Sequence, residues 1–99
     1  MRPIHAAWLD RDRPVVVLTR ELVRPHLTRV TVAPITSTAR GLSTEVAAGL
    51  ANGLEQEGVV SCDDIVTVPR TALGRQLGYL LPGQEAALTA AIRAAFDLD

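Results

Sequence analysis

Short runs of apolar, mainly β-branched residues alternate with polar turns along this chain, which is the pattern of a small β-sheet protein. The run Pro14–Thr19 reads Pro-Val-Val-Val-Leu-Thr and predicts a strand buried on both faces. In Arg29–Ile35 the valines alternate with Thr31 and Ala33, which is the two-residue period of a strand. Further strands are predicted at His5–Leu9, Thr44–Ala48, Gly58–Cys62, Ile65–Val68 and Arg75–Leu80.

One helix of several turns is predicted, over Pro82–Phe96. Pro82 and Glu85 lie in its first turn, where proline and an acidic side chain favour a helix start. Its apolar face is predicted to hold Leu88, Ile92, Ala95 and Phe96. The other connections are predicted as short helical turns at Arg20–Leu27 and Pro69–Leu73, a loop over Thr36–Ser43, and turns at Asp10–Arg13, Asn52–Gly53 and Asp63–Asp64.

These elements predict the fold class. Several short strands closed by one helix indicate a mainly β (α+β) protein, built as a small barrel or a twisted, half-open antiparallel sheet with short helical turns. No repeat or linker interrupts the chain, so a single domain over residues 1–99 is expected.

The composition narrows the class of protein. Hydrophobic residues make up 47% of the chain, which excludes a disordered charged tail. Trp8, Tyr79 and Phe96 are the only aromatic residues, so the core is predicted to consist of methyl-bearing side chains. Because a domain of this size buries a limited share of its surface, the apolar excess also predicts a surface shared with a partner.

Charge and cysteine content limit the partners and the location. The 10 cationic side chains, all arginine, and the 11 acidic ones leave a net charge of -1, which argues against a general nucleic-acid coat but allows one arginine-lined groove. The single Cys62 excludes an intramolecular disulfide and is typical of a reducing compartment. No apolar run approaches the ~18 residues that cross a bilayer, and no secretory pattern begins the chain. A cytoplasmic protein with no membrane partner is expected.

One pair of residues is a candidate for phosphate chemistry. Arg13 precedes the buried strand, and Thr36 ends the next predicted strand. If the two strands are neighbours, a forked guanidinium donor and a hydroxyl meet at one sheet edge, which is a phosphate site. The more common arrangement is that Arg13 pairs with Asp10 or Asp12 and that Thr36 caps a turn.

The remaining reactive side chains indicate no metal or cofactor. His5, His26, Cys62 and the pair Asp63–Asp64 lack the spacing of a metal site. Cys62 lies in a β-branched run and is predicted to be a small buried hydrophobe. The acidic pair is predicted to form a turn, with a catalytic carboxylate as the alternative.

The order of the strand sequences resembles one known family. The strings Arg13–Leu18, Val30–Ser37, Val59–Val68 and Leu77–Leu80 are similar in sequence and order to the MazF family of toxin endoribonucleases, over nearly the whole chain. The resemblance implies an SH3-like β-barrel with a C-terminal helix, acting as a homodimer. It implies metal-independent, sequence-specific cleavage of single-stranded RNA to 2′,3′-cyclic phosphate and 5′-hydroxyl ends. It also implies a cognate MazE-type antitoxin that blocks the RNA groove.

Residue by residue, the resemblance matches Arg13 to the family's catalytic arginine and Thr36 to its catalytic threonine. Two departures are visible: the first loop is reduced to Asp10–Asp12, and Asp64 stands where the family often has glutamine. A carboxylate there repels phosphate but can accept from a base amino group. The RNA-binding residues are predicted to be Asp12, Ser37, Arg40, Asp64 and Thr67.

Two other functions remain open on the sequence. A CcdB-like toxin would share the barrel and the dimer but inhibit DNA gyrase without nuclease chemistry. Such proteins are expected to act through a tryptophan near the end of the helix, whereas this chain ends Phe96-Asp97-Leu98-Asp99. The third possibility is a barrel that only binds a partner, which requires that Arg13 be paired with Asp12 and buried.

Overall fold

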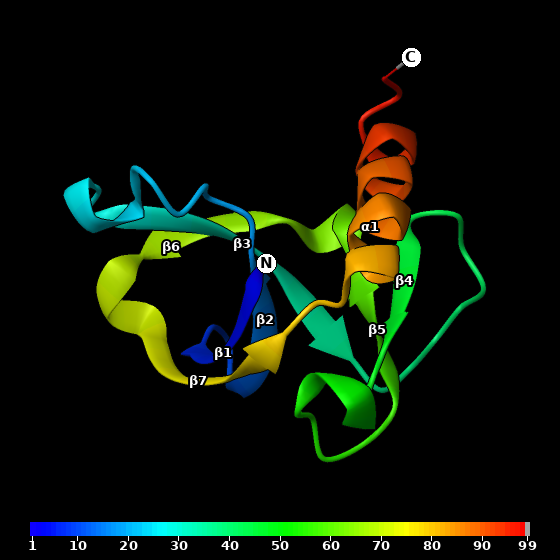
Figure 1. The fold of residues 1–99 in the computed structure, drawn as a ribbon, viewed down its shortest axis with the longest axis horizontal. Coiled ribbons are helices and arrows are strands. Elements are labelled where there is room, and N and C mark those ends of the chain that lie inside the picture. The colour runs from blue at the N-terminus through cyan, green and yellow to red at the C-terminus, as the bar shows by residue number, and fades with distance from the viewer. Residues whose placement is uncertain (99) are drawn as a thin grey trace.

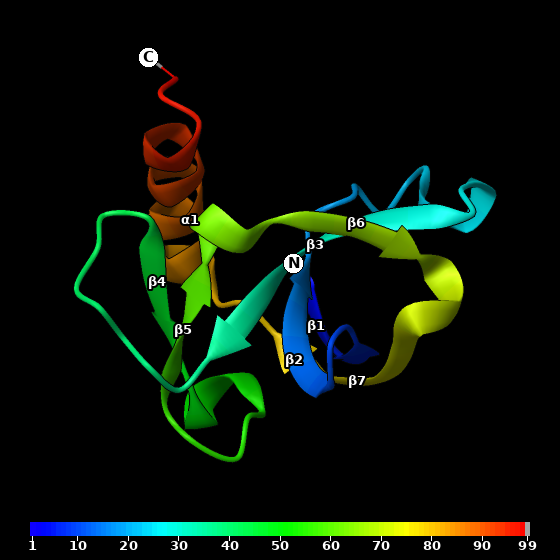
Figure 2. The same cartoon turned by 180° about the vertical axis from the view of Figure 1, so that it is seen from behind.

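The computed structural model describes residues 1–98, which form a strongly bent antiparallel sheet and one α-helix. Figures 1 and 2 show the helix and two strands on one side, and the other strands on the opposite side. The strands are β1 (Pro3–Trp8), β2 (Asp12–Val17), β3 (Arg29–Thr36), β4 (Glu45–Ala48), β5 (Gly58–Ser61), β6 (Val66–Pro69) and β7 (Leu73–Tyr79), and the helix is α1 (Pro82–Ala95). Short 3-10 turns occupy Arg24–His26 (η1), Leu50–Asn52 (η2), Cys62–Asp64 (η3) and Arg70–Ala72 (η4).

Strand β3 is the centre of the sheet. The strand order is β4-β5-β3-β2-β1-β7, and β6 pairs separately with β3. One edge of β3 pairs with β2, while the other edge pairs with β6 over Arg29–Val32 and then with β5 at Ile35 and Thr36. Because β3 changes partners along its length, it crosses from one half of the molecule to the other (Figure 1).

Two apolar clusters fill the two halves. Val15 and Val17 of β2 pack into a cluster with Val30 and Val32 of β3, whereas Val16 faces the other cluster, which packs beneath α1. All three β2 valines are fully buried, so the predicted strand buried on both faces is confirmed. The buried core among residues 1–98 is aliphatic apart from Cys62 and Asn52, and Trp8, Tyr79 and Phe96 are exposed. The prediction of a methyl-bearing core is therefore also confirmed.

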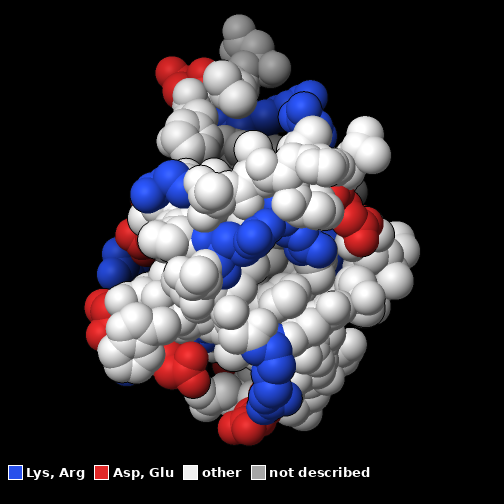
Figure 3. All heavy atoms as spheres, turned by 90° about the vertical axis from the view of Figure 1, so that its left-hand side faces the viewer, with Lys and Arg blue, Asp and Glu red and all other residues white. Residues whose placement is uncertain are grey.

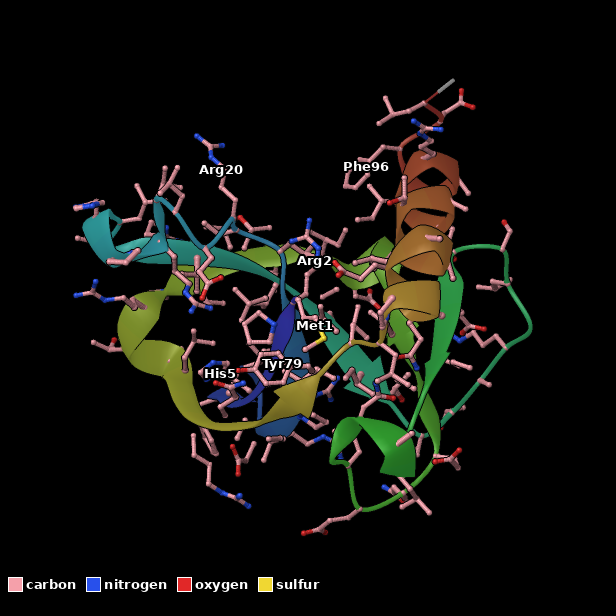
Figure 4. The ribbon with its side chains drawn as sticks, viewed as in Figure 1. Met1, Arg2, His5, Arg20, Tyr79 and Phe96 are labelled. Carbon is pink, nitrogen blue, oxygen red and sulfur yellow. The ribbon has the colours of Figure 1, made fainter. Side chains whose placement is uncertain are left out.

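The N-terminal residues tie the helix to the sheet. Arg2 donates from Nη1 to the Leu18 carbonyl at 2.7 Å, and its Nε lies 3.6 Å from the Glu85 carboxylate of α1 (Figure 4). The Leu80 amide donates to the Arg2 carbonyl at 3.0 Å. These contacts fix the start of α1 beside β1. None of the helices within residues 1–98 is long and apolar enough to span a membrane.

The predicted class, a mainly β sheet with short turns and a C-terminal helix, is confirmed, and the differences concern boundaries. Strand β2 begins at Asp12 rather than at Pro14, because β1 pairs with it as far as Trp8 opposite Asp12. Arg13 therefore lies on a strand and not in the charged turn. That turn shrinks to residues 9–11, closed by the Leu9 amide donating to the Arg11 carbonyl at 3.1 Å.

The last strand and the helix also differ from their predictions. Strand β7 begins at Leu73 and ends at Tyr79, because its pairing with β1 extends to Ala7 opposite Leu73. The buried face of α1 consists of Leu88 and Ala91 with Ile92 and Ala95 packed against it. The prediction that Phe96 shares this face is wrong: Phe96 lies at the end of the helix and is 56% exposed.

Candidate active site

A groove of about 640 Å³ lies where four segments meet. It is lined by the start of β2, the end of β3, the connection between η2 and β5, and the middle of β7. Arg13 and Thr36, the predicted phosphate pair, both line it, as do Asp12 and Ser37. The structure therefore brings together four of the predicted site residues.

The pairing of β2 with β3 explains why Arg13 and Thr36 meet. Val15 lies opposite Pro34, Val16 opposite Ala33 and Val17 opposite Val32. Continuing this antiparallel register by two residues places Arg13 across from Thr36. Side chains at facing positions project to the same side of a sheet and lie about 5 Å apart at Cβ, so the guanidinium and the hydroxyl reach the same groove.

Asp10 contacts Arg13 through one guanidinium nitrogen only. The Arg13 Nη2 lies 3.4 Å from the Asp10 carboxylate, an exposed partner three residues earlier. The Arg13 side chain is only 22% exposed, and its Nε is buried without a hydrogen-bond partner among residues 1–98. Asp10 therefore anchors one nitrogen of Arg13, while the residue still lines the groove.

Thr36 is oriented by the loop that follows it. Its Oγ1 accepts a hydrogen bond from the Thr38 amide at 3.2 Å. The turn-capping role weighed from the sequence is therefore real, and it leaves the hydroxyl hydrogen available to donate to a phosphate. The backbone of Gly58 lies against Thr36: an added Cβ there would come within 2.4 Å of the Thr36 carbonyl oxygen.

Three of the predicted RNA-binding residues lie elsewhere. Thr67 is on β6 opposite Thr31, with their hydroxyls 2.7 Å apart, about 16 Å along β3 from Thr36 at the usual rise of a strand. Asp64 accepts from the Ser61 hydroxyl at 2.8 Å in η3, the turn predicted for the acidic pair. Arg40 lies in the loop after β3, where its amide donates to the Glu45 carboxylate. None of the three lines the groove.

The groove also contains residues that the sequence analysis missed. Arg75 of β7 and Arg11 add two guanidinium groups, and the segment Gly53–Gly58 supplies Glu55, Gln56 and Glu57. The pairing of β1 with β7 places Arg75 in the groove, and the sequence alone does not predict this pairing. The Asn52–Gly53 turn signal was visible, but the side of the sheet on which it folds was not.

The other reactive side chains do not form a second centre. The groups of His, Cys, Asp and Glu within residues 1–98 include none that could hold a metal ion. Burial raises the pKa of the Cys62 thiol, with a further contribution from the neighbouring Asp63 charge. Cys62 is therefore the buried hydrophobe that was predicted. The His5 Nδ1 lies 3.0 Å from the Gly74 carbonyl oxygen of β7.

The groove is lined by guanidinium groups together with the carboxylates of Asp12, Glu55 and Glu57. Guanidinium groups bind phosphate oxygens through forked donors, and Arg11, Arg13 and Arg75 lie in one groove. Arginines also gather outside it. Figure 3 faces the side of the molecule that carries η1 and η4, and blue groups cross the middle of that face, with red groups mainly at its margins.

The chain is similar to a group of toxins in sequence and structure. Residues 6–96 match the family of PemK-like, MazF-like toxins of type II toxin–antitoxin systems. Over 99 residues the chain is 66% identical to endoribonuclease MazF3 of Mycobacterium tuberculosis, and this similarity spans 100% of the chain and 96% of that protein. The solved structure of the Mycobacterium tuberculosis toxin MazF-mt6 has a TM-score of 0.97 and 65% identity, over 99% of each chain. An endoribonuclease from a mycobacterial species, solved with its cognate antitoxin, has a TM-score of 0.88 at 26% identity, over 98% of this chain and 93% of that one.

The fold, the groove and these similarities define an endoribonuclease toxin built on a small antiparallel sheet with one helix. The chain belongs to the family of PemK-like, MazF-like toxins of type II toxin–antitoxin systems. The predicted family and enzyme class are confirmed. The alternative of a CcdB-like gyrase inhibitor finds no support.

Proposed function

We propose that this toxin cleaves single-stranded RNA at short sequences, without a metal ion, with Arg13 and Thr36 as its catalytic residues. The observation that carries the proposal is the position of Arg13: it is partly buried and anchored through one nitrogen to Asp10, and it lines the same groove as Thr36. A phosphate between the two side chains would accept hydrogen bonds from the guanidinium group and from the threonine hydroxyl.

In the proposed reaction, the ribose 2′-oxygen attacks the adjacent phosphorus as the 2′-hydroxyl proton passes to water. The bond from phosphorus to the 5′-oxygen breaks, and that oxygen takes a proton from water, so no net proton is consumed. The products are a 2′,3′-cyclic phosphate and a 5′-hydroxyl. The nucleophile belongs to the substrate, so the protein has to stabilise the crowded, negatively charged phosphorane, and fixed donors do this. A guanidinium keeps its protons at ordinary pH, so Arg13 acts as a donor to phosphorane oxygens and the leaving 5′-oxygen. Thr36 holds the phosphate in position.

The RNA is proposed to run from the groove onto neighbouring surface. Asp12 and Ser37 flank the catalytic pair and line the groove, which supports contacts with the nucleotides at the cut. Arg40, Asp64 and Thr67 lie outside the groove and are exposed, so they are proposed to contact only flanking nucleotides.

A homodimer and a cognate MazE-type antitoxin are the proposed protein partners, and the proposed location is the cytoplasm. Support for the antitoxin comes from the family and from a structural relative solved with its cognate antitoxin. Support for the dimer comes from exposed apolar side chains, among them Met1 and Tyr79. Sedimentation that shows only monomer at micromolar concentration would contradict the dimer.

The cleavage proposal is tested with purified protein, a long mixed-sequence RNA and EDTA. Wild type is expected to make discrete cuts with cyclic-phosphate ends, and Arg13→Ala is expected to lose at least ~10²-fold in rate, as removal of a single transition-state donor does in other enzymes. Arg93→Ala, in the last turn of α1, is the matched control and should cut like wild type. RNA left intact by the wild type, or cleavage that EDTA abolishes, would contradict the proposal.

A further inference from the structure

The segment Gly53–Gly58 forms one wall of the groove, on the side of Thr36 opposite Arg13. The strand order β5-β3-β2 places the end of β3 between β5 and β2. Val59, at the start of β5, pairs with Thr36, and Arg13 lies on β2. A phosphate held by Arg13 and Thr36 therefore has this wall on its other side, and the wall is lined by Glu55 and Gln56.

A buried amide pair fixes the beginning of the wall. Asn52 is 2% exposed. Its Nδ2 donates to the Tyr79 carbonyl at 2.9 Å and to Oε1 of Gln84 at 2.6 Å, while its Oδ1 accepts from the Gly49 amide at 3.0 Å. Gln84 in turn donates to the Ala47 carbonyl at 3.0 Å. The pair ties η2 to β4, to β7 and to the first turn of α1.

The rest of the wall is fixed by its backbone and by Glu57. Gly53 has φ +85°, and a Cβ there would come within 2.2 Å of the Leu77 carbonyl oxygen of β7. The Leu54 side chain is buried. The Glu57 carboxylate accepts from the Leu50 amide at 2.6 Å and occupies the space beside Gly49. The wall is therefore preorganised before any ligand arrives.

In this fixed wall, the side chains of Glu55 and Gln56 make no contact that holds the described structure together. Glu55 and Gln56 are exposed, line the groove and make no hydrogen bond to another residue within 1–98. A carboxylate repels phosphate, so Glu55 is not suited to bind the phosphate groups of the RNA. It can instead accept a hydrogen bond from the amino group of a base. Phosphate contacts position a nucleic acid, whereas contacts with base edges specify its sequence.

We infer that Glu55 and Gln56 are specificity-determining residues, which read the base next to the scissile phosphate. Glu55 selects a base that carries an exocyclic amino group, as cytosine, adenine and guanine do, over uracil. Gln56 adds a second polar contact with the same nucleotide. The inference rests on the proposed RNA cleavage, and it divides the groove into arginines that position the phosphate and a rigid wall that reads the base.

The test compares cut-site profiles on a randomised RNA library for wild type, Glu55→Gln and Gln56→Ala. Glutamine can donate to the O4 of uracil. Glu55→Gln should therefore lower the preference for an amino-bearing base over uracil at one position beside the cut. The expected change is about ten-fold, which is the discrimination that one good base contact supplies. Gln56→Ala should broaden the same position. The rate at the best site should fall by at most about the same ten-fold, because a base contact is weakened while the phosphate contacts are intact.

Two matched controls are available outside the groove: Glu21→Gln, an exposed acid before η1, and Gln76→Ala on β7. Both should keep the wild-type profile, and thermal unfolding of all variants should match wild type. Unchanged profiles in both wall variants, with wild type cutting at discrete sites, would overturn the specificity role alone. A wild type that cuts no RNA would overturn the cleavage proposal, and the specificity role with it.

Discussion

The register of two neighbouring antiparallel strands, continued by two residues, places Arg13 across from Thr36, although the two residues are 23 positions apart in the sequence. Their distance is fixed by the Val15–Pro34, Val16–Ala33 and Val17–Val32 pairs, whose side chains alternate between two closed apolar clusters. A register shift of one residue would turn buried valines outward. The core therefore holds Arg13 and Thr36 in place. No loop movement is needed to bring these two side chains together.

The hydroxyl of Thr36 is expected to be essential for the rate, while its methyl group is not. Thr36→Val keeps the shape but removes the donor to phosphate and the acceptor for the Thr38 amide. Its cleavage rate should fall on the order of 10- to 100-fold, somewhat less than for a charged donor. Thr36→Ser should stay within a few-fold of wild type. Single-turnover cleavage of a short RNA measures this, and equal rates for the valine and serine variants would contradict it.

Gly58 is expected to tolerate no side chain, because its backbone lies against Thr36. A Cβ at Gly58 would lie 2.4 Å from the Thr36 carbonyl oxygen and 3.4 Å from the Ser37 Cα. Gly58→Ala must therefore displace the end of β3, and a misplacement of about 1 Å can cost ~10²-fold in rate. The comparison uses cleavage rates together with circular dichroism.

Gly83→Ala is the matched control for Gly58→Ala. Within 4 Å of its added Cβ there is no atom of the described chain, and alanine favours the helix over glycine by roughly 0.5–1 kcal/mol. This variant should cleave normally and unfold at the same or a slightly higher temperature. Normal cleavage by Gly58→Ala would show that the contact with Thr36 has no role in the rate.

Asn52 is expected to carry much of the stability of the groove wall. Asn52→Ala leaves the Gly49 amide, the Tyr79 carbonyl and the Gln84 side chain without their buried partner. Each buried polar group left unpaired costs about 1–3 kcal/mol. Urea unfolding should therefore show a loss of roughly 2–4 kcal/mol, which is less than the full sum for three groups because the surrounding structure relaxes. Thr89→Ala, which removes an exposed hydroxyl bonded within α1, should change stability little. A loss below about 0.5 kcal/mol for Asn52→Ala would contradict the role of the amide pair.

Much of the fold was predictable because its signals are local. The β-branched run around Val16, the alternation in β3 and the proline at the start of α1 each identify an element without knowledge of its partners. The boundaries were less predictable because they depend on pairing. In the sequence, Asp12 and Arg13 look like part of a charged turn. They belong to β2 because β1 is long enough to pair with both of them. Phe96 has helical spacing, but the helix ends before it can be buried.

About half of the candidate site could be predicted from the sequence. Arg13 and Thr36 followed from two strand ends and from the family resemblance, and Ser37 came with Thr36. The groove wall was not predictable, because Glu55 and Gln56 sit in a connection whose position depends on the contact of Gly53 with β7 and on the buried Asn52. Asp64 and Thr67 were candidates through the family resemblance, yet η3 and β6 place them away from the groove.

Glu45 is expected to make the loop between β3 and β4 sensitive to acid. The Leu42 amide donates to its carboxylate at 3.0 Å, and the Arg40 amide donates at 3.1 Å. Hydrogen bonding by Leu42 is the main cause of a Glu45 pKa below its usual value, with smaller help from Arg40 and Gly41 against an opposing effect of burial. The charged form is therefore bound more tightly in the folded state than in the unfolded chain.

The sign of the pH effect follows from that depressed pKa. The stabilising contribution of Glu45 is present above the carboxyl's unfolded pKa and is lost as the pH falls through the lower, folded pKa. Glu45→Gln has no such titration, so the difference in urea midpoint between wild type and this variant should shrink as the pH is lowered from 6 toward 3. Glu21→Gln should show a difference that does not change in this way. A wild-type advantage over Glu45→Gln that stays constant or grows toward acid would show that the loop amides do not favour the charged carboxylate.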